Sequence, residues 1–257
     1  MSESFSDFRK FDSLAIDDSI YENYDRIGQE GFLGKAVVPT FGGATVRTEF
    51  ELMFGLPVRS LNNALVPHDI LDVDKQQATF ARYFKEQGYD TAYIHPFSGS
   101  FYGRDEVYST YGFDKMIFQD DLTVPQEYFR RYMDDKVVFD QITQLLEEND
   151  APSYLYATTM QNHQPYKADG EQGGDQELDY YLEGIEHTDK QLGAFIDSLK
   201  ELDEPTVVVF IGDHMPFFSS DCDVYEDLGV ADGQSEIIYE QSYLVWANYD
   251  FDYSALE

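Results

Sequence analysis

A run of five apolar residues, followed by a glycine, an acid and a histidine, constrains the fold of this chain more than any other segment. The residues are Val207-Val208-Val209-Phe210-Ile211, then Gly212-Asp213-His214. Because β-branched and aromatic residues dominate the run, it predicts a strand covered on both faces, as in an α/β protein. Gly212 permits a turn, so Asp213 and His214 should project from the carboxyl end of the strand, where open α/β sheets bind ligands.

Two interpretations of this acid–histidine pair stay open at this point. A carboxylate beside an imidazole is a suitable start for a metal site. Alternatively, Asp213 caps the following turn and His214 simply packs in the interior. Short motifs of this kind often mislead, so the choice depends on what else the fold brings to the same edge.

Charge and cysteine content exclude several classes of function. The chain has 257 residues, 50 of them acidic and 17 basic, and its formal net charge is −33. This argues against a general nucleic-acid binder and against electrostatic docking on an anionic membrane. An anionic substrate must then be attracted locally, by a metal ion or an isolated arginine. Cys222 is the only cysteine, which excludes an internal disulfide and a cysteine-based zinc cluster.

The chain carries no sign of a targeting segment or of several domains. No stretch approaches the roughly 20 apolar residues that a membrane-spanning helix needs. Residues 1–7 lack the basic start and apolar core of a signal peptide. Since repeats and linker-like changes in composition are also absent, we expect residues 1–257 to form one domain.

Three of the five histidines follow predicted strands. His95 comes after the strand predicted at Thr91–Ile94, and His163 ends the segment that begins with the strand Tyr154–Met160. His214 follows the run described first. Carboxyl ends of parallel strands share one edge of a sheet, so we expect these three histidines to converge there.

Helices are predicted between these strands, and this order is typical of βαβ units. A Gly- and acid-rich stretch at residues 167–176 is predicted to be a mobile flap. The predicted helices are Asp74–Gln87, a largely helical stretch at Leu122–Asn149 that is broken near Met133–Asp135, and Glu177–Leu202.

Thr45 begins a further predicted helix, Thr45–Phe54, after the glycine pair Gly42-Gly43. Free N–H groups and the helix dipole favour negative charge at such a position. The hydroxyl has two roles open to it. It can cap the helix, or it can act as a nucleophile towards phosphorus, with a metal ion stabilising its alkoxide.

Arg104 stands out in a Gly- and aromatic-rich loop that follows His95. In so acidic a chain, an arginine near a strand end can hold an anionic oxygen bidentately. It can equally form an ion pair with the neighbouring Asp105 or Glu106. The residues alone leave both roles open.

Together, several short segments resemble the extracellular catalytic domain of the lipoteichoic acid synthase family, phosphoglycerol transferases of the alkaline phosphatase and sulfatase superfamily. The resemblance covers nearly the whole chain and implies an α/β fold, a sulfatase/alkaline phosphatase-like three-layer sandwich with a mostly parallel central sheet. The matching segments are Ser2–Phe5, Gly42–Thr45 with Glu49-Phe50, Phe101–Asp105, Met160–Tyr166 and Gly212–His214.

This resemblance implies a set of site residues. Thr45 would be the catalytic nucleophile, activated by contact with one divalent ion. An oxygen-rich ligand set with one imidazole suits manganese or magnesium better than zinc, and manganese, common in the family, is preferred. The implied metal ligands are Glu3, Thr45, Asp213 and His214, and the implied substrate-binding residues are His163, Arg104, His95 and Tyr102.

The implied reaction is a two-step transfer in cell-envelope biosynthesis. Thr45 attacks phosphatidylglycerol and releases diacylglycerol. A glycerol-phosphate polymer or a glycolipid then takes the phosphoglyceryl group from the threonine. A histidine can protonate the leaving alkoxide. The parent protein is expected to be anchored in the bacterial plasma membrane, with this domain extracellular.

The chain also departs from the family pattern. The family places an apolar strand before the metal-binding Glu, carries transmembrane helices, and continues beyond the last strand seen here. We therefore expect a catalytic domain truncated at both ends, with Glu3 poorly held and weak metal affinity. Thr45-Val46-Arg47 lacks the Cys or Ser, Pro and Arg pattern of a true sulfatase. A phosphodiesterase, a phosphoethanolamine transferase and a non-catalytic polyanion-binding fragment remain alternatives.

Overall fold

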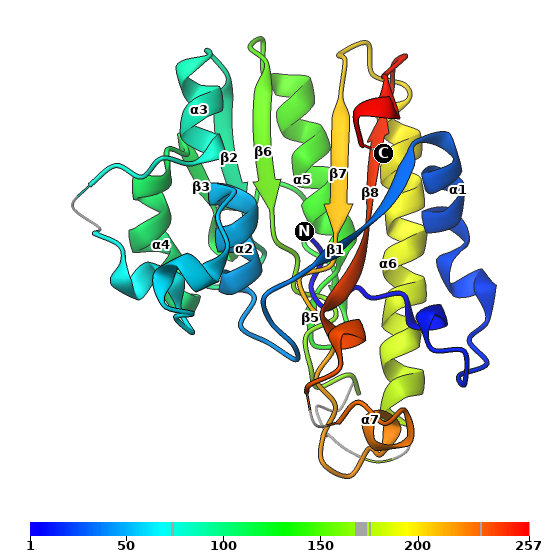
Figure 1. The fold of residues 1–257 in the computed structure, drawn as a ribbon. Helices are drawn as coiled ribbons and strands as arrows, with labels where there is room; N and C mark the ends of the chain where they lie inside the picture. The colour runs from blue at the N-terminus through cyan, green and yellow to red at the C-terminus, as the bar shows by residue number, and fades with distance from the viewer. Residues whose placement is uncertain (73–74, 168–173, 175, 232, 257) are drawn as a thin grey trace.

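Strands and helices alternate along the chain in the computed structural model, which describes residues 1–72, 75–167, 174, 176–231 and 233–256 (Figure 1). Most of the flap predicted at residues 167–176 lies outside these residues. The strands are β1 Phe32–Val37, β2 Asp90–Ile94, β3 Lys115–Ile117, β4 Tyr128–Phe129, β5 Tyr132–Met133, β6 Ser153–Ala157, β7 Val207–Ile211 and β8 Glu240–Ala247. The α-helices are α1 Glu22–Glu30, α2 Val46–Phe54, α3 Phe80–Glu86, α4 Arg104–Val107, α5 Asp135–Glu148, α6 Glu177–Leu199 and α7 Val224–Asp227.

Two three-stranded sheets meet at the N-terminal residues. In one sheet β2 pairs in parallel with β3 and β6, and in the other β8 pairs antiparallel with β1 and β7. The Met1 amino group donates to the carbonyl of Ala157 at 2.7 Å, and the Ser2 N–H donates to Ile211 at 2.8 Å. Figure 1 shows the N-terminus between β6 and β7, whose arrows point the same way. Only β8 of these six strands runs in the opposite direction, so the prediction of a mostly parallel arrangement is confirmed.

The β3-β2-β6 sheet is covered on both faces. Alternate side chains of a strand point to opposite faces, so consecutive residues of β2 enter different clusters. Tyr93 packs in a cluster with Met53 of α2. Ile94 packs on the other side with Val138 and Leu145 of α5. Helices on the two sides therefore give this part of the fold its three layers.

The β1-β8-β7 sheet is covered on one face only. Phe210 of β7 packs with Leu244 and Trp246 in a large cluster that also includes α1 and α6. The side chains of Val207 and Val209 point to the other face and are 43% and 59% exposed. The prediction that this strand is covered on both faces is therefore wrong for its first residues, because the described helices cover only one side of it.

The stretch predicted as largely helical at residues 122–149 is helical only in its second half. Pro125 lacks a backbone N–H and disfavours a helix there. Instead β4 and β5 form a hairpin whose turn contains Arg130 with φ of 57°. Helix α5 begins after Asp134, whose side chain accepts a hydrogen bond from the Lys136 N–H.

Helices α2 and α6 lie where they were predicted, whereas α3 is shorter than expected. It begins after Thr79, whose side chain accepts from the Arg82 N–H and so caps the helix. The 23-residue helix α6 buries its apolar face in the same cluster as Phe210. Within the described residues, no helix combines the length and the apolar character needed to cross a membrane.

Candidate active site

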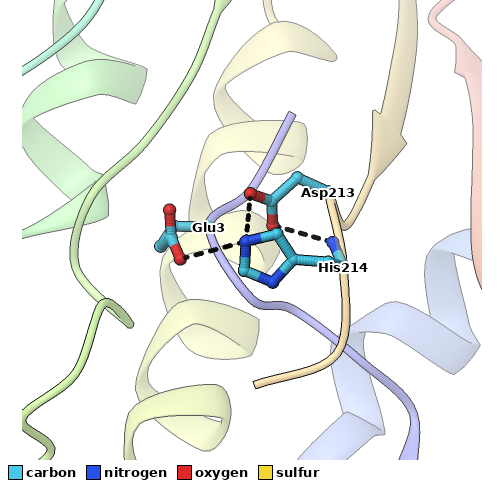
Figure 2. A group of neighbouring side chains, drawn as sticks. All are labelled: Glu3, Asp213 and His214. Atoms are coloured by element: carbon cyan, nitrogen blue, oxygen red, sulfur yellow. Dashed lines mark hydrogen bonds and ion pairs between the residues drawn. The ribbon is translucent and has the colours of Figure 1, made fainter. Parts of the chain in front are cut away.

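Three buried side chains meet where the N-terminal segment passes the end of β7. Glu3, Asp213 and His214 each offer a ligand atom, and these atoms lie within 4.8 Å of one another (Figure 2). We call these three residues the acidic cluster. Each is at most 2% exposed. The structure thus brings together three of the four residues predicted to hold a metal ion.

The close approach of two segments explains the glycine that ends β7. A Cβ at Gly212 would lie 1.8 Å from the carbonyl oxygen of Phe5, so no other residue fits without moving the backbone. The N-terminal segment is also tied to the segment that follows β6, because the Glu3 N–H donates to the hydroxyl of Thr159 at 3.1 Å. Glu3 is therefore buried and bonded, which differs from the expectation that it would be poorly held.

Hydrogen bonds orient the Asp213 carboxylate and leave one oxygen free. Its Oδ1 accepts from the N–H groups of Ser4 at 2.7 Å and His214 at 3.0 Å. Its Oδ2 is buried, accepts no well-formed hydrogen bond, and lies 3.0 Å from Nε2 of His214. Nδ1 of His214 is 2.8 Å from the Met215 carbonyl and must donate to it, so Nε2 is the nitrogen that faces Oδ2. In the charged ring Nε2 donates a proton to Oδ2, and in the neutral ring it has a lone pair that can bind a metal ion instead.

The acidic cluster fits a divalent cation. Burial and the charge of Asp213 raise the pKa of Glu3, so the cluster does not easily hold two ionised carboxylates by itself. Burial opposes a charge on His214, but Asp213 outweighs it and raises the pKa of the imidazole to about 9. Buried anions are costly unless a positive charge is paired with them. Glu3, Asp213 and His214 would hold such a cation, which would supply that positive charge in place of the proton on His214.

Thr45 faces the acidic cluster from the start of α2. It occupies the N-cap position, but its side chain makes no capping hydrogen bond. Its Oγ1 lies 3.5 Å from Oε2 of Glu3 and 3.5 Å from Nε2 of His214. Gly42 and Gly43, with φ of 68° and 146°, form the turn that leads into this position. Of the two roles open to Thr45, the geometry favours the nucleophile.

Arg104 is fully buried, and its partner is a residue that the sequence analysis did not assign. Nε and Nη2 lie 3.1 and 3.0 Å from Oε2 of Glu49, while Asp105 and Glu106 are exposed. Nη1 donates to the Phe101 carbonyl at 3.1 Å. Three of the five N–H groups of a guanidinium are thus used, and two remain for an anionic oxygen.

Glu49 holds this arginine and also other parts of the site. Its Oε1 accepts from the hydroxyls of Tyr93 at 2.9 Å and Thr158 at 2.6 Å, and its Oε2 accepts from Tyr108 at 2.5 Å. Burial opposes ionisation of Glu49, but Arg104 and these hydroxyls lower its pKa overall. Glu49 lies four residues after Thr45, on the same face of α2, and this spacing could have revealed it.

His95 and His163 present the same nitrogen to the site. Nδ1 of His95 lies 2.9 Å from the Thr158 carbonyl, and Nδ1 of His163 lies 2.7 Å from the carbonyl of Gln164. Each Nδ1 donates a proton, which leaves Nε2 free. Burial, with the nearby Arg104, lowers the pKa of His95 to about 3, so this ring is neutral. His95 can therefore accept a hydrogen bond but is a poor proton donor.

Tyr102 lies next to Arg104 in an unusual backbone conformation. Its φ is 60°, which non-glycine residues rarely adopt. The guanidinium carbon of Arg104 is 5.1 Å from the centre of its ring. His68, another residue that the sequence analysis did not assign, donates through Nε2 to the Tyr102 carbonyl at 2.6 Å. Strain of this kind is common at functional sites.

Comparison with known proteins gives a family match over almost the whole chain. The model of the family described as Sulfatase matches residues 1–252. A protein of Rhizobium meliloti (strain 1021) whose name assigns it to cyclic beta-1,2-glucan modification is 28% identical over 242 residues, covering 84% of this chain and 36% of the relative. The capsular polysaccharide biosynthesis protein RkpI of the same organism is 30% identical over 240 residues, covering 88% and 42%. This chain therefore spans about two fifths of the length of these curated relatives.

Solved structures of the same fold include a phosphoglycerol transferase and a lipoteichoic acid synthase. The phosphoglycerol transferase GacH of Streptococcus pyogenes, in complex with sn-glycerol-1-phosphate, matches with a TM-score of 0.80 and 26% identity, covering 96% of this chain and 66% of that one. The lipoteichoic acid synthase LtaP of Listeria monocytogenes matches with a TM-score of 0.75 and 22% identity, covering 96% and 64%. A periplasmic domain of EcEptC from Escherichia coli in complex with Zn has a TM-score of 0.66 and 16% identity, covering 99% and 75%. The expected sulfatase-like α/β fold is confirmed.

Proposed function

We propose that this chain, which belongs to the sulfatase family, is the catalytic part of a metal-dependent phosphoglycerol transferase that uses Thr45 as its nucleophile. One observation carries the proposal. The Thr45 hydroxyl does not cap its helix but faces a buried cluster of two carboxylates and one imidazole, a set of ligand types suited to a divalent cation. The likeness to a phosphoglycerol transferase structure supports the choice of the transferred group.

The ligand set proposed for the ion is Glu3, Thr45, Asp213 and His214, with manganese as the preferred ion and magnesium as the second choice. A divalent ion at this place would favour the alkoxide of the threonine and stabilise negative charge on the phosphoryl group. Three ligand atoms are oxygens and one is nitrogen, which agrees with a hard ion.

In the first step Thr45 attacks the phosphorus of phosphatidylglycerol as the alkoxide that a bound ion would favour, its hydroxyl proton having gone to solvent, and in the second step it leaves as the same alkoxide. A bond forms between its Oγ and phosphorus, the bond from phosphorus to the diacylglycerol oxygen breaks, and the leaving oxygen takes a proton. His163 is the proposed donor of that proton, through Nε2, because His95 is held neutral. Arg104, fixed by Glu49, offers its two remaining N–H groups to a phosphoryl oxygen.

In the second step an acceptor hydroxyl attacks the phosphoglyceryl-threonine. Its proton goes to Nε2 of His163, and the bond between Thr45 and phosphorus breaks. His95 and Tyr102 are proposed to contact the glycerol moiety. The acceptor would be a glycerol-phosphate polymer or a glycolipid of the cell envelope, and the domain would work on the outer side of the bacterial plasma membrane.

Mass spectrometry of the intact protein tests this proposal. The chain is incubated with phosphatidylglycerol and manganese and compared with Thr45→Ala. We expect a covalent phosphoglycerol adduct that maps to Thr45, with release of diacylglycerol, and neither product from the variant. An adduct formed only from phosphatidylethanolamine would instead identify a phosphoethanolamine transferase. Diacylglycerol release with free glycerol phosphate and no transfer to any hydroxyl acceptor would identify a phosphodiesterase.

A further inference from the structure

Four half-buried aromatic side chains form an unbroken row of ring contacts beside the proposed active site. Tyr132 and Phe97 have ring centres 6.3 Å apart, Phe97 and Phe101 5.4 Å, and Phe101 and Tyr102 4.6 Å. All four side chains are half-buried. We call these four residues the aromatic shelf. They come from the loop after β2, from the turn Phe101–Gly103, and from β5 of the hairpin.

The shelf borders the residues proposed to handle the substrate. The ring of Phe97 lies 6.3 Å from that of His95, and the ring of Tyr132 lies 5.3 Å from that of His163. Burial, and to a lesser degree the charge of Glu3, raises the pKa of both Tyr102 and Tyr132, so both phenols sense the acidic cluster. One end of the shelf is therefore close to the base proposed for the acceptor hydroxyl.

Core packing does not explain the shelf. None of its four residues belongs to the hydrophobic clusters that the described residues form around α2, α5 and α6. Aromatic rings contribute large binding areas at little cost in conformational entropy when one face stays open. A half-buried row of rings that lies outside these clusters and next to a proposed reaction centre is thus better explained by a ligand than by stability.

The charge of the chain indicates what kind of ligand this is. At a net charge of −33, a polymer with one phosphate per repeat is repelled over its whole length. The shelf side chains themselves carry no charge at neutral pH. Flat aromatic faces suit the C–H faces of pyranose rings, and neutral sugars avoid the electrostatic penalty.

We infer that the aromatic shelf is the acceptor subsite of the proposed transferase and that the acceptor is a neutral carbohydrate. The inference rests on the proposed function and narrows its acceptor. A sugar ring stacks on the face of Tyr132, meets Phe97, whose ring is inclined at 67° to that of Tyr132, and directs a primary hydroxyl to the phosphoglyceryl-threonine. The hydroxyl oxygen bonds to phosphorus, its proton goes to Nε2 of His163, and Thr45 leaves. The names of the two Rhizobium relatives, a glucan modification protein and a capsular polysaccharide protein, agree with this choice.

Saturation-transfer NMR with a neutral cyclic β-1,2-glucan tests the subsite without requiring turnover. We expect strong signals from the glucan and weak ones from a glycerol-phosphate oligomer. Phe97→Ala and Tyr132→Ala should each weaken glucan binding about tenfold. Tyr132→Phe keeps the aromatic ring, so this variant should bind the glucan as the wild type does. Tyr83→Ala, at a 57% exposed tyrosine of α3, is the matched control and should leave it unchanged.

A transfer assay separates this inference from the proposed function. With phosphatidylglycerol as donor, Phe97→Ala and Tyr132→Ala should raise the KM for the glucan about tenfold. Preference for the glycerol-phosphate oligomer, or glucan binding unchanged in both alanine variants, would overturn the inference. Glucan binding at the shelf by a wild-type protein that releases no diacylglycerol would uphold the subsite and reject the phosphatidylglycerol donor.

Discussion

Two places in this fold hold buried carboxylates close together, namely Glu49 and the acidic cluster. They differ in how the negative charge is compensated. Glu49 accepts hydrogen bonds from three hydroxyls and is neutralised by Arg104. The acidic cluster has two carboxylates that share a single imidazole, with Nε2 of His214 3.0 Å from Oδ2 of Asp213. Burial alone is therefore no mark of a functional acid. The unbalanced group is the one suited to an ion, and the balanced one fixes the residues around it.

The titration of the two groups reflects this difference. Burial raises the pKa of Glu3, with help from Asp213, whereas Arg104 and the hydroxyls overcome burial and lower the pKa of Glu49. The Glu49 carboxylate thus contributes stability above its usual pKa, and this contribution is lost as the pH falls. Ionised Glu3 has the opposite effect when no metal ion is bound.

The largest effect is expected from Glu49→Gln. The substitution leaves the Arg104 guanidinium buried without its counter-charge, and breaking such a pair typically costs about 3–5 kcal/mol. Urea unfolding should show this loss. Glu147→Gln, at an exposed glutamate of α5, is the control and should change the free energy of unfolding by less than about 0.5 kcal/mol. A loss below about 1 kcal/mol in Glu49→Gln would show that Arg104 does not compensate the charge of Glu49, and the contrast with the acidic cluster would then fail.

Glu3→Gln should have an effect that depends on the metal ion. Without metal, removing one of two neighbouring buried charges should leave the melting temperature unchanged or raise it. With manganese at about 100 times its Kd, the wild type should gain about 2.7 kcal/mol, and the variant should gain much less. Thermal melts of both proteins without manganese and with it measure the metal-free melting temperature and the stabilisation by the metal ion. Equal manganese stabilisation of both proteins would remove Glu3 from the ligand set.

Asp135 is a further buried carboxylate whose charge is only partly compensated, and its substitution should have a smaller effect on stability. Thr188 donates to its Oδ2 at 2.9 Å, while its buried Oδ1 has no hydrogen-bond partner. Burial raises its pKa from the usual 3.8 to about 6. Between these values the folded chain binds more protons than the unfolded chain, so stability falls as the pH rises. Asp135→Asn should remove this slope and stabilise the protein at pH 7 by at most about 3 kcal/mol, lessened by the weaker hydrogen bond that Thr188 makes to an uncharged acceptor. A variant with the same pH slope as wild type would contradict this assignment.

Sequence patterns predicted the parts of the fold that local chemistry determines. The apolar run of β7, the helix after Thr45 and the three histidines after strand ends were all foreseeable, because period and chain order decide them. The hairpin at residues 128–133 was missed, although Pro125 was a signal. Its turn depends on Arg130, which donates to carbonyls of Tyr166 and Tyr180, and such distant contacts leave no local pattern.

The sequence predicted which residues lie at the site, but it did not predict the hydrogen bonds that connect them. Position in the chain indicated the acidic cluster, whereas the hold of Glu49 on Arg104 joins residues 55 positions apart. The local alternatives for that arginine, Asp105 and Glu106, were wrong because they face solvent. Likewise, the open face of β7 could not be read from its apolar run, since exposure depends on which helices pack there.

Manganese binding by isothermal titration calorimetry tests the central claim most directly. Asp213→Asn is suited to this test because its amide oxygen can still accept from Ser4 and His214, while its NH2 can donate to the imidazole. Asp150→Asn, at an exposed position, is the control. We predict one manganese site per chain in the wild type and the control, and an affinity at least about 100-fold lower in Asp213→Asn. No binding by the wild type, or binding retained in a folded Asp213→Asn, would contradict the account.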